Sequence, residues 1–244
     1  MKCDWDNVGL LCGRRNQEVK KILVALDPFM DVCEEAAAIG ADLIVTHHPL
    51  IFRAPKTVTT DDTVGQCILF LASHGISAVN AHTNLDCAPE GVNDVLAQTL
   101  GLETVEVLNA EGVDEQGRPW GLLRTGTVAE TDLKSFLQLV KDRLHTPVLR
   151  YADGGKPVHR VAVGGGSCAD ALREVLDAGC DTFVTADIKY NQFWDASDLG
   201  LNLIDAGHFY TENPVCAVLA SKLQVQFPEV EVVLSKHSDC MKFF

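Results

Sequence analysis

The sequence predicts an α/β protein built from two similar lobes with largely parallel sheets. Two observations carry this prediction: short apolar segments alternate with segments of helical periodicity, and the same alternation occurs twice along the chain. Apolar strands that alternate with helices are typical of crossover units, which place neighbouring strands in parallel. The chain has 244 residues, which is enough for one large domain or two small ones with separate cores.

The first half alternates three apolar strands with three helices. We expect strands at residues 19–27, 41–49 and 76–86. We expect helices at residues 30–40, 62–75 and 91–102, the first of which ends on Gly40 as a glycine cap.

A polar, turn-rich stretch at residues 109–121 marks the expected boundary, so the predicted lobes are residues 1–120 and 121–244. The second half repeats the alternation. We expect helices at 130–144, 168–179 and 190–200, and strands at 158–167, 180–187 and 201–212.

The two halves also resemble each other in detail. The segment GADLIVTHH aligns with GCDTFVTAD, which places Gly40 on Gly179 at an offset of 139 residues. The segment GISAVNAHTNLD aligns with GLNLIDAGHFYTE, which places Gly75 on Gly200 at an offset of 125 residues. We interpret this as an internal duplication, although a general α/β rhythm would produce part of it.

Composition narrows the class of protein. Lys and Arg number 20 against 34 Asp and Glu, a formal charge of −14, which disfavours nucleic-acid backbones as partners. The nine cysteines are dispersed without a C-x-x-C motif, which argues against a disulfide framework and favours a reducing cytoplasm. The apolar runs are too short for a membrane span, and the N-terminus lacks the pattern of an export signal.

Polar residues follow the expected strands at matched places in the two halves. His47 and His48 end one strand, and Asp86 ends the next. His208 and Glu212 end the strand that aligns with the Asp86 strand. Ligands of open parallel sheets sit beyond the carboxyl ends of the strands, so these residues predict a site between the two lobes.

Three imidazoles and two carboxylates are more ligands than one catalytic ion requires, and they suit two ions about 3.5–4 Å apart. Nitrogen and oxygen donors suit divalent Zn, Fe, Mn, Ni or Co without selecting among them. The simpler alternatives are a half-buried histidine beside a solvated one at residues 47 and 48, a turn role for Asp86, and a charge before a helix for Glu212.

Six motifs together resemble the Nif-three-like family, the homologues of the NGG-interacting factor. They occur in the family's order over essentially the whole chain: DWDNVGLLCG, DLIVTHHPLIF, AHTNLD, GGGS, TADIKYNQ and DAGHFYTE. The resemblance implies two α/β lobes, a dinuclear metal site at His47, His48, Asp86, His208 and Glu212, and a ring-like homohexamer. Bacterial members are often named GTP cyclohydrolase one, type two.

This chain departs from the family pattern in three places. Relatives usually have a helix before the WDNVGL motif, whereas this chain starts almost at the motif, which leaves a truncated start open. Longer relatives carry an inserted domain for which this chain has no room. Asn191 stands where the resemblance leads us to expect a histidine, so a proton-transfer step at that position is in doubt here.

Further residues are secondary candidates. His82 precedes Asp86 by four residues and is either a partner of the metal ligands, an acid–base group or a partly buried strand histidine. Lys189 and Tyr190 follow a strand where a substrate anion could be held. We interpret the glycines of Gly164–Ser167 as a tight turn rather than a phosphate-binding loop. Asp6 and Asn7 either line the site or form a turn, and among the remaining histidines only His237 is kept as a candidate.

The predicted function is a dinuclear metal-dependent hydrolase, and the resemblance suggests hydrolytic opening of the guanine ring of GTP. The main alternative is a non-catalytic metal-binding protein that regulates a partner or delivers metal. The expected partners are further copies of the chain and a small molecule such as a nucleotide. A ring that threads single-stranded nucleic acid is the weakest interpretation, because basic and aromatic patches are lacking.

Overall fold

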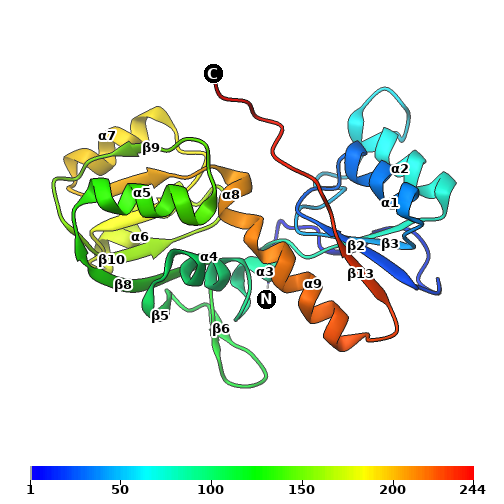
Figure 1. Ribbon diagram of the computed structural model, residues 1–244, viewed down its shortest axis with the longest axis horizontal. Helices are drawn as coiled ribbons and strands as arrows, with labels where there is room; N and C mark the ends of the chain where they lie inside the picture. Colours follow the sequence, from blue (N-terminus) through cyan, green and yellow to red (C-terminus); the bar gives the residue numbers. More distant parts are fainter. Residues whose placement is uncertain (1) are drawn as a thin grey trace. The chain divides into compact units, whose positions relative to one another are not determined.

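The computed structural model describes residues 2–244, which divide into two compact units. Unit 1 contains the residues up to Leu85 together with Cys216–Cys240, and unit 2 contains Asp86–Val215 together with Met241–Phe244. The chain therefore leaves unit 1, builds unit 2 and returns (Figure 1). The boundary expected at residue 120 falls inside unit 2.

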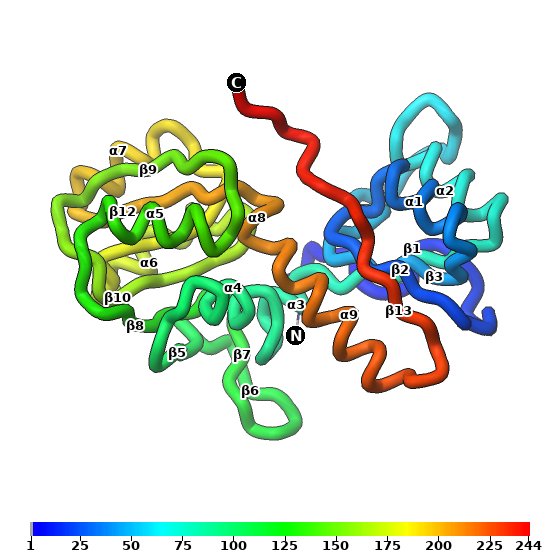
Figure 2. The backbone as a smooth tube through the Cα atoms, viewed as in Figure 1, coloured from blue at the N-terminus to red at the C-terminus, as the bar shows by residue number. Residues whose placement is uncertain are grey.

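The sheet of unit 1 has five strands among the described residues, in the order β1-β4-β3-β2-β13. These strands are β1 (Gly9–Cys12), β2 (Lys21–Ala25), β3 (Leu43–Thr46), β4 (Ser77–Asn80) and β13 (Glu231–Leu234). Helices α1 (Met30–Ile39) and α2 (Thr63–His74) pack on it through a core that includes Leu23, Ile44, Cys33 and Leu71. The last strand of the chain lies beside β2 (Figure 2), although about 210 residues separate them.

The helices of unit 1 begin and end at clear sequence signals. The Asp62 carboxylate accepts a hydrogen bond from the Gly65 amide and caps the start of α2. Gly40 and Gly75 close α1 and α2 in the left-handed conformation, with φ of 68° and 69°. Glycine adopts this conformation without steric cost, so both helices stop where the chain must turn into the next strand.

The sheet of unit 2 has six strands in the part of the chain that the structure describes, in the order β5-β8-β10-β11-β12-β9. These are β5 (Glu103–Leu108), β8 (Leu123–Thr131), β9 (Arg150–Ala152), β10 (Val158–Val163), β11 (Thr182–Thr185) and β12 (Asn202–Asp205). A small hairpin, β6 (Gly112–Val113) with β7 (Pro119–Trp120), occupies the turn-rich stretch of the sequence.

Helices cover both faces of this second sheet. Successive strand residues point to opposite faces, and Val163, Val184 and Ile204 belong to one core cluster whereas Ala162, Phe183 and Leu203 belong to another. The first cluster receives α4 (Val92–Leu100) and α5 (Leu133–Leu144). The second receives the 3-10 turn η1 (Ala169–Ala171), α6 (Leu172–Asp177) and α7 (Tyr190–Asp198).

The observed fold is a mixed α/β fold, as the alternation of strands and helices predicted. The expectation of largely parallel sheets holds for unit 1, where three of the four pairings among residues 2–244 are parallel. It is wrong for unit 2, where four of the six pairings among the described residues are antiparallel. The sequence analysis did not predict strands β5, β8 and β9, because they lack the strong apolar pattern of buried parallel strands.

Two expected strands are shorter than predicted. They end at Asn80 and Asp205, and each is followed after two residues by a five-residue helix: α3 (Thr83–Cys87) and α8 (His208–Glu212). Asp86, His208 and Glu212 therefore lie on short helices and not on strand ends. The remaining helix, α9 (Pro214–Gln226), leads to β13. Among residues 2–244, no helix combines the length and apolar character that a membrane span requires.

Candidate metal centre

The carboxyl edge of the unit 1 sheet carries a row of polar residues. Parallel strands bring their carboxyl ends to one edge, and an antiparallel neighbour brings its start there. Along the sheet order the residues beside the strand ends are His237 (β13), Asp27 (β2), His47 and His48 (β3), His82 (β4) and, before β1, Asp6.

Three of these residues form a histidine cluster. The ring centroids of His47 and His48 are 5.0 Å apart, and His82 lies 5.3 Å and 5.7 Å from them. One ligand atom from each residue lies within 4.8 Å of the other two, which is close enough for a shared ion. His82, expected as a partner or an acid–base group, thus lies directly beside the predicted ligands of this unit.

A hydrogen bond at Nδ1 fixes the orientation of each of the three rings. The Nδ1 atom of His47 donates to the Ala81 carbonyl at 2.9 Å. Those of His48 and His82 donate to Asp27 Oδ1 at 2.7 Å and Asp6 Oδ1 at 2.8 Å. A carbonyl or carboxylate oxygen only accepts, so each Nδ1 carries a hydrogen, and in the neutral ring the opposite Nε2 keeps its lone pair. Metal-binding histidines are commonly held in this way.

Burial favours the neutral, metal-binding form of one ring of this cluster, that of His82. Burial lowers the pKa of His82, helped by the neighbouring imidazoles and opposed by Asp6. A lowered pKa favours the neutral ring, which is the form that binds metal. Burial alone would raise the pKa of Asp27, but hydrogen bonds from His237 and His48 outweigh it and hold that pKa well below its usual range. Asp27 is therefore ionised.

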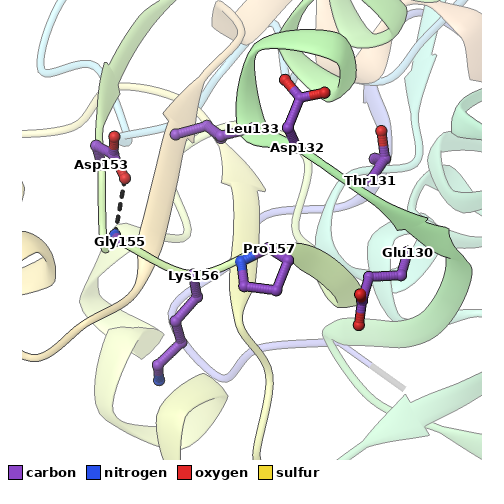
Figure 3. Close-up of a pocket in the computed structure, with 8 residues that line it drawn as sticks. All are labelled: Glu130, Thr131, Asp132, Leu133, Asp153, Gly155, Lys156 and Pro157. Carbon is purple, nitrogen blue, oxygen red and sulfur yellow. Dashed lines mark hydrogen bonds between the residues drawn. The ribbon is translucent and has the colours of Figure 1, made fainter.

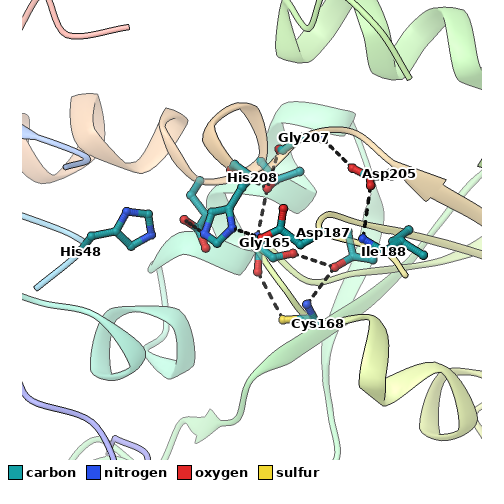
Figure 4. A network of polar contacts seen from close by, with 12 residues as sticks. His48, Gly165, Cys168, Asp187, Ile188, Asp205, Gly207 and His208 are labelled. Carbon is teal, nitrogen blue, oxygen red and sulfur yellow. Dashed lines mark hydrogen bonds and ion pairs between the residues drawn. The ribbon is translucent and has the colours of Figure 1, made fainter. Parts of the chain in front are cut away.

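Unit 2 supplies a histidine and a carboxylate one helical turn apart on α8. The Nε2 atom of His208 lies 3.0 Å from Glu212 Oε2, and its Nδ1 donates to Asp187 Oδ2 at 2.7 Å (Figure 4). Burial opposes a charged ring, but the two carboxylates outweigh it and raise the pKa of His208 to about 10. Metal binding at His208 would therefore displace a proton.

The glycine loop of Gly164–Ser167 packs against this pair. Gly166 has φ of +62°, and a Cβ there would overlap Glu212 Oε1 and lie 2.9 Å from His208 Nε2. The Gly165 amide donates to Asn93 Oδ1 at 2.7 Å and the Gly166 amide to Thr211 Oγ1 at 3.0 Å. These amides are used inside the fold, which agrees with a tight turn and leaves them unavailable to phosphate.

The backbone around Asp86 is fixed by two buried residues. Asn93 donates from Nδ2 to the Asp86 carbonyl at 3.3 Å and to the Leu122 carbonyl at 2.6 Å. Arg124 pairs with Asp94 and donates to the Ala88 carbonyl at 3.1 Å. The short helix that carries Asp86 is thus held by hydrogen bonds outside itself, as a five-residue helix requires.

Lys189 and Tyr190 lie at the start of α7, and neither has a recorded interaction with His208 or Glu212 within residues 2–244. The Lys189 ammonium lies 3.8 Å from Asp170, and Tyr190 is 80% exposed. Asn191 is also exposed. The predicted role of Lys189 and Tyr190 in holding a substrate anion stays a prediction.

Two aromatic side chains border the histidine cluster. Trp5 and Phe52 are 63% and 48% exposed, and each ring centroid lies 6.1 Å from that of His82.

A separate open hollow of about 590 Å³ is lined by residues 130–133, 153 and 155–157 of unit 2 (Figure 3), and it contains none of the predicted site residues.

The sequence analysis named Asp6 but missed two other carboxylates that orient the histidines. Asp27 and Asp187 each end a strand that the sequence predicted, so their position at a carboxyl edge was the available signal. Asn93 gave no such signal, because it lies inside a helical pattern and acts through contacts with distant segments.

The fold and the site together define the class of this protein. It is a mixed α/β protein in which histidines and carboxylates gather at sheet edges, which makes it a candidate metal-binding protein. The model of the Duf34/NIF3 (NGG1p interacting factor 3) family matches residues 1–240. The chain belongs to this family, as the sequence motifs indicated.

Relatives of known name agree with this assignment. A Clostridium perfringens protein named GTP cyclohydrolase 1 type 2 homolog is 37% identical over 98% of this chain and 91% of its own length. A Clostridium acetobutylicum protein of the same name is 37% identical over 92% and 84%.

Solved structures share the fold. A Bacillus cereus protein related to NIF3 superposes with a TM-score of 0.92 at 26% identity, over 99% of this chain and 94% of that one. Reduced HcgD from Methanocaldococcus jannaschii gives a TM-score of 0.79 at 27% identity, over 96% and 91%.

Proposed function

We propose that the protein is a metal-dependent hydrolase that holds two divalent transition-metal ions through His47, His48, Asp86, His208 and Glu212. The observation that carries this proposal is that the Nδ1 atom of each proposed histidine ligand is hydrogen-bonded to an oxygen atom. His47 and His48 are held by Ala81 and Asp27, and His208 by Asp187. Such support orients the opposite nitrogen and raises its basicity toward a metal.

The donor set agrees with two ions. Each proposed ligand is a nitrogen or oxygen donor, which suits Zn, Fe, Mn, Ni or Co. When bound, two such ions would lower the pKa of a water between them toward neutrality. We assign to His82 the acceptance and return of a proton at its Nε2; its hydrogen bond to Asp6 and its lowered pKa support this role. Lys189 and Tyr190 remain the proposed anion-holding residues.

The proposed substrate is a nucleotide, with hydrolytic opening of the guanine ring of GTP as the first reaction to test. The support is the name shared by the relatives, GTP cyclohydrolase 1 type 2 homolog. With a net charge of −14 the protein would repel a triphosphate. Bound metal would have to offset that repulsion. We further propose a homohexamer in the cytoplasm, as the family resemblance and the dispersed cysteines suggest.

Replacing Asp86 with asparagine tests the metal centre directly. Asn keeps the shape of the side chain but removes a negative charge, so we expect loss of at least one of two bound ions per chain and of any metal-dependent turnover. The backbone contacts of Asp86 use its carbonyl, so the apo protein should fold normally. Metal stoichiometry and apo-protein melting temperature are the measurements, with the exposed helical Asp142→Asn as the control.

A variant that binds two ions as tightly as wild type would remove Asp86 from the site. A wild-type protein that binds metal but shows no turnover with GTP or other nucleotides, before or after chelation and remetallation, would favour the non-catalytic metal-binding alternative. Molar mass by light scattering tests the hexamer.

A further inference from the structure

We propose that His237, near the C-terminus, is a positioning residue for the metal ligand His48 and acts through the carboxylate of Asp27. This inference rests on the proposed function, because it assumes that His48 binds a metal. It adds to the proposed metal centre a residue that lies outside the motifs that supply the metal ligands.

The order of the strands brings these residues into line. In the unit 1 sheet β13, β2 and β3 are neighbours and run parallel, so the residues that follow them meet at one edge. His237 follows β13, Asp27 follows β2 and His48 follows β3. The C-terminal segment is therefore placed two strands away from the ligand by the sheet itself.

The contacts form a continuous path. The Nε2 atom of His237 lies 3.3 Å from Asp27 Oδ2, and the other oxygen of Asp27 accepts from His48 Nδ1 at 2.7 Å. One carboxylate thus bridges two imidazoles with one oxygen for each. The His237 side chain is only 9% exposed, so solvent is largely kept from its end of the path.

The segment that carries His237 is fixed to helix α1 at two points one turn apart. Glu35 accepts from the Ser235 hydroxyl and from the Lys236 amide, the latter at 3.1 Å. Asp31 accepts from His237 Nδ1 at 2.5 Å. Both nitrogens of His237 face carboxylate oxygens, so the ring donates from both and is held as a cation.

Because the Asp27 carboxylate contacts both rings, His237 influences the orientation of the proposed metal ligand His48. Asp27 can rotate about its side-chain bonds unless both oxygens are held, and the His48 ring turns with it. Loss of an outer partner of a metal-binding histidine typically weakens metal affinity by about 10–100-fold. His237 is one contact further from the metal ligand than Asp27. We therefore expect a loss of metal affinity at the low end of this range, about tenfold.

The alternative is that His237 merely anchors the end of the chain. The anchor and the bridge can be separated, because Glu35 anchors residues 235 and 236 but has no recorded contact with Asp27 within residues 2–244. Glu35→Ala therefore loosens the segment and spares the bridge. His237→Gln restores one donor toward Asp27, and His159→Ala removes an exposed histidine as a matched control.

The experiment measures Co²⁺ and Zn²⁺ affinity of the full chain by chelator competition, together with the visible absorption spectrum of the Co²⁺ form. We expect His237→Ala to lose about tenfold in affinity for one ion and to change the Co²⁺ spectrum, with partial recovery in His237→Gln. Glu35→Ala and His159→Ala should keep wild-type affinity and spectrum, while Glu35→Ala lowers the melting temperature.

Two results would overturn the proposal while leaving the metal centre intact: wild-type affinity and spectrum in His237→Ala, or an equal loss in Glu35→Ala. If His237→Ala does not fold, an unaltered spectrum in His237→Gln combined with a loss in Glu35→Ala would overturn it as well. Wild-type protein that takes up neither metal would instead overturn the proposed function itself.

Discussion

Units 1 and 2 share a backbone frame but place their chemistry differently. Strand β3 maps onto β11 at an offset of 139 residues, and β4 with α3 maps onto β12 with α8 at an offset of 125. The hydrogen bonds repeat as well: Asp42 accepts from the amides of residues 20 and 21, and Asp181 accepts from those of residues 159 and 160. This agreement supports the internal duplication inferred from the sequence.

The side chains at equivalent positions differ where chemistry occurs. The position of His48 is taken by Asp187 in unit 2, and that of Asp27 by Gly166. In unit 1 a carboxylate at a strand end orients a histidine at the next strand end. In unit 2 the strand end gives the carboxylate, and the histidine comes from α8. The comparison teaches that the frame fixes where polar groups meet, while a few residues decide which group is the proposed ligand and which group orients it.

The largest expected effect concerns Gly166, which stands where unit 1 has Asp27. Gly166→Ala should cost about 3 kcal/mol of unfolding free energy, because it adds left-handed strain and pushes Glu212 and His208 out of place. Gly155→Ala is the control: its φ is +72° but a Cβ there meets no atom within 4 Å, so only the strain of about 1 kcal/mol remains. Denaturant unfolding of the apo proteins measures both, and equal losses would contradict the close approach of the loop.

A smaller effect tests the shared frame. Asp42→Ala and Asp181→Ala each remove a carboxylate that accepts from two consecutive amides, so each should cost about 2 kcal/mol. If the units are structural equivalents, the two losses should agree within about 0.5 kcal/mol. The measurements are unfolding free energy and hydrogen exchange at the Lys21 and Arg160 amides. A loss confined to one unit would break the equivalence.

The smallest expected effect is a pH dependence that belongs to unit 1. Hydrogen bonds to Asp27 and Asp31 raise the pKa of His237 to about 9 against the opposing effect of burial. A pKa raised on folding stabilises the folded state fully below the unfolded value of about 6.5, and the gain is lost as pH rises through about 9. The stability advantage of wild-type apo protein over His237→Gln should therefore be fully present near pH 6, shrink as the pH rises, and be lost near pH 10. An advantage that grows over this range would contradict the protonated state of His237.

Local sequence patterns predicted the parts of the fold that local physics controls. The apolar runs predicted β2, β3, β11 and β12, and a glycine cap predicted the end of α1 at Gly40. The pairing of β13 with β2 was not predictable in this way, because nothing in residues 231–234 specifies a partner near residue 21. The antiparallel pairing in unit 2 was not predicted for a different reason: strands β5, β8 and β9 lack the apolar pattern of buried parallel strands.

For the candidate site, the polar residues at strand ends identified the two histidine-bearing segments. His82 was weighed as a partner or an acid–base group, and the structure places its ring beside His47. The supporting residues were harder to predict. Asp6 and His82 are 76 positions apart, and only the antiparallel pairing of β1 with β4 brings them together.

The return of the chain to its first sheet has a consequence during synthesis. Strand β2 pairs with a strand that begins at residue 231, so a nascent chain exposes an unpaired β2 edge until about 210 further residues have been made. At about 5–20 residues per second, that interval is on the order of 10–40 s. Residues 86–215, which make up most of unit 2, are contiguous and can fold meanwhile. The N-terminal sheet is therefore completed only after the strand at residues 231–234 has been made, and the histidines at its edge acquire their final surroundings later than the core of unit 2.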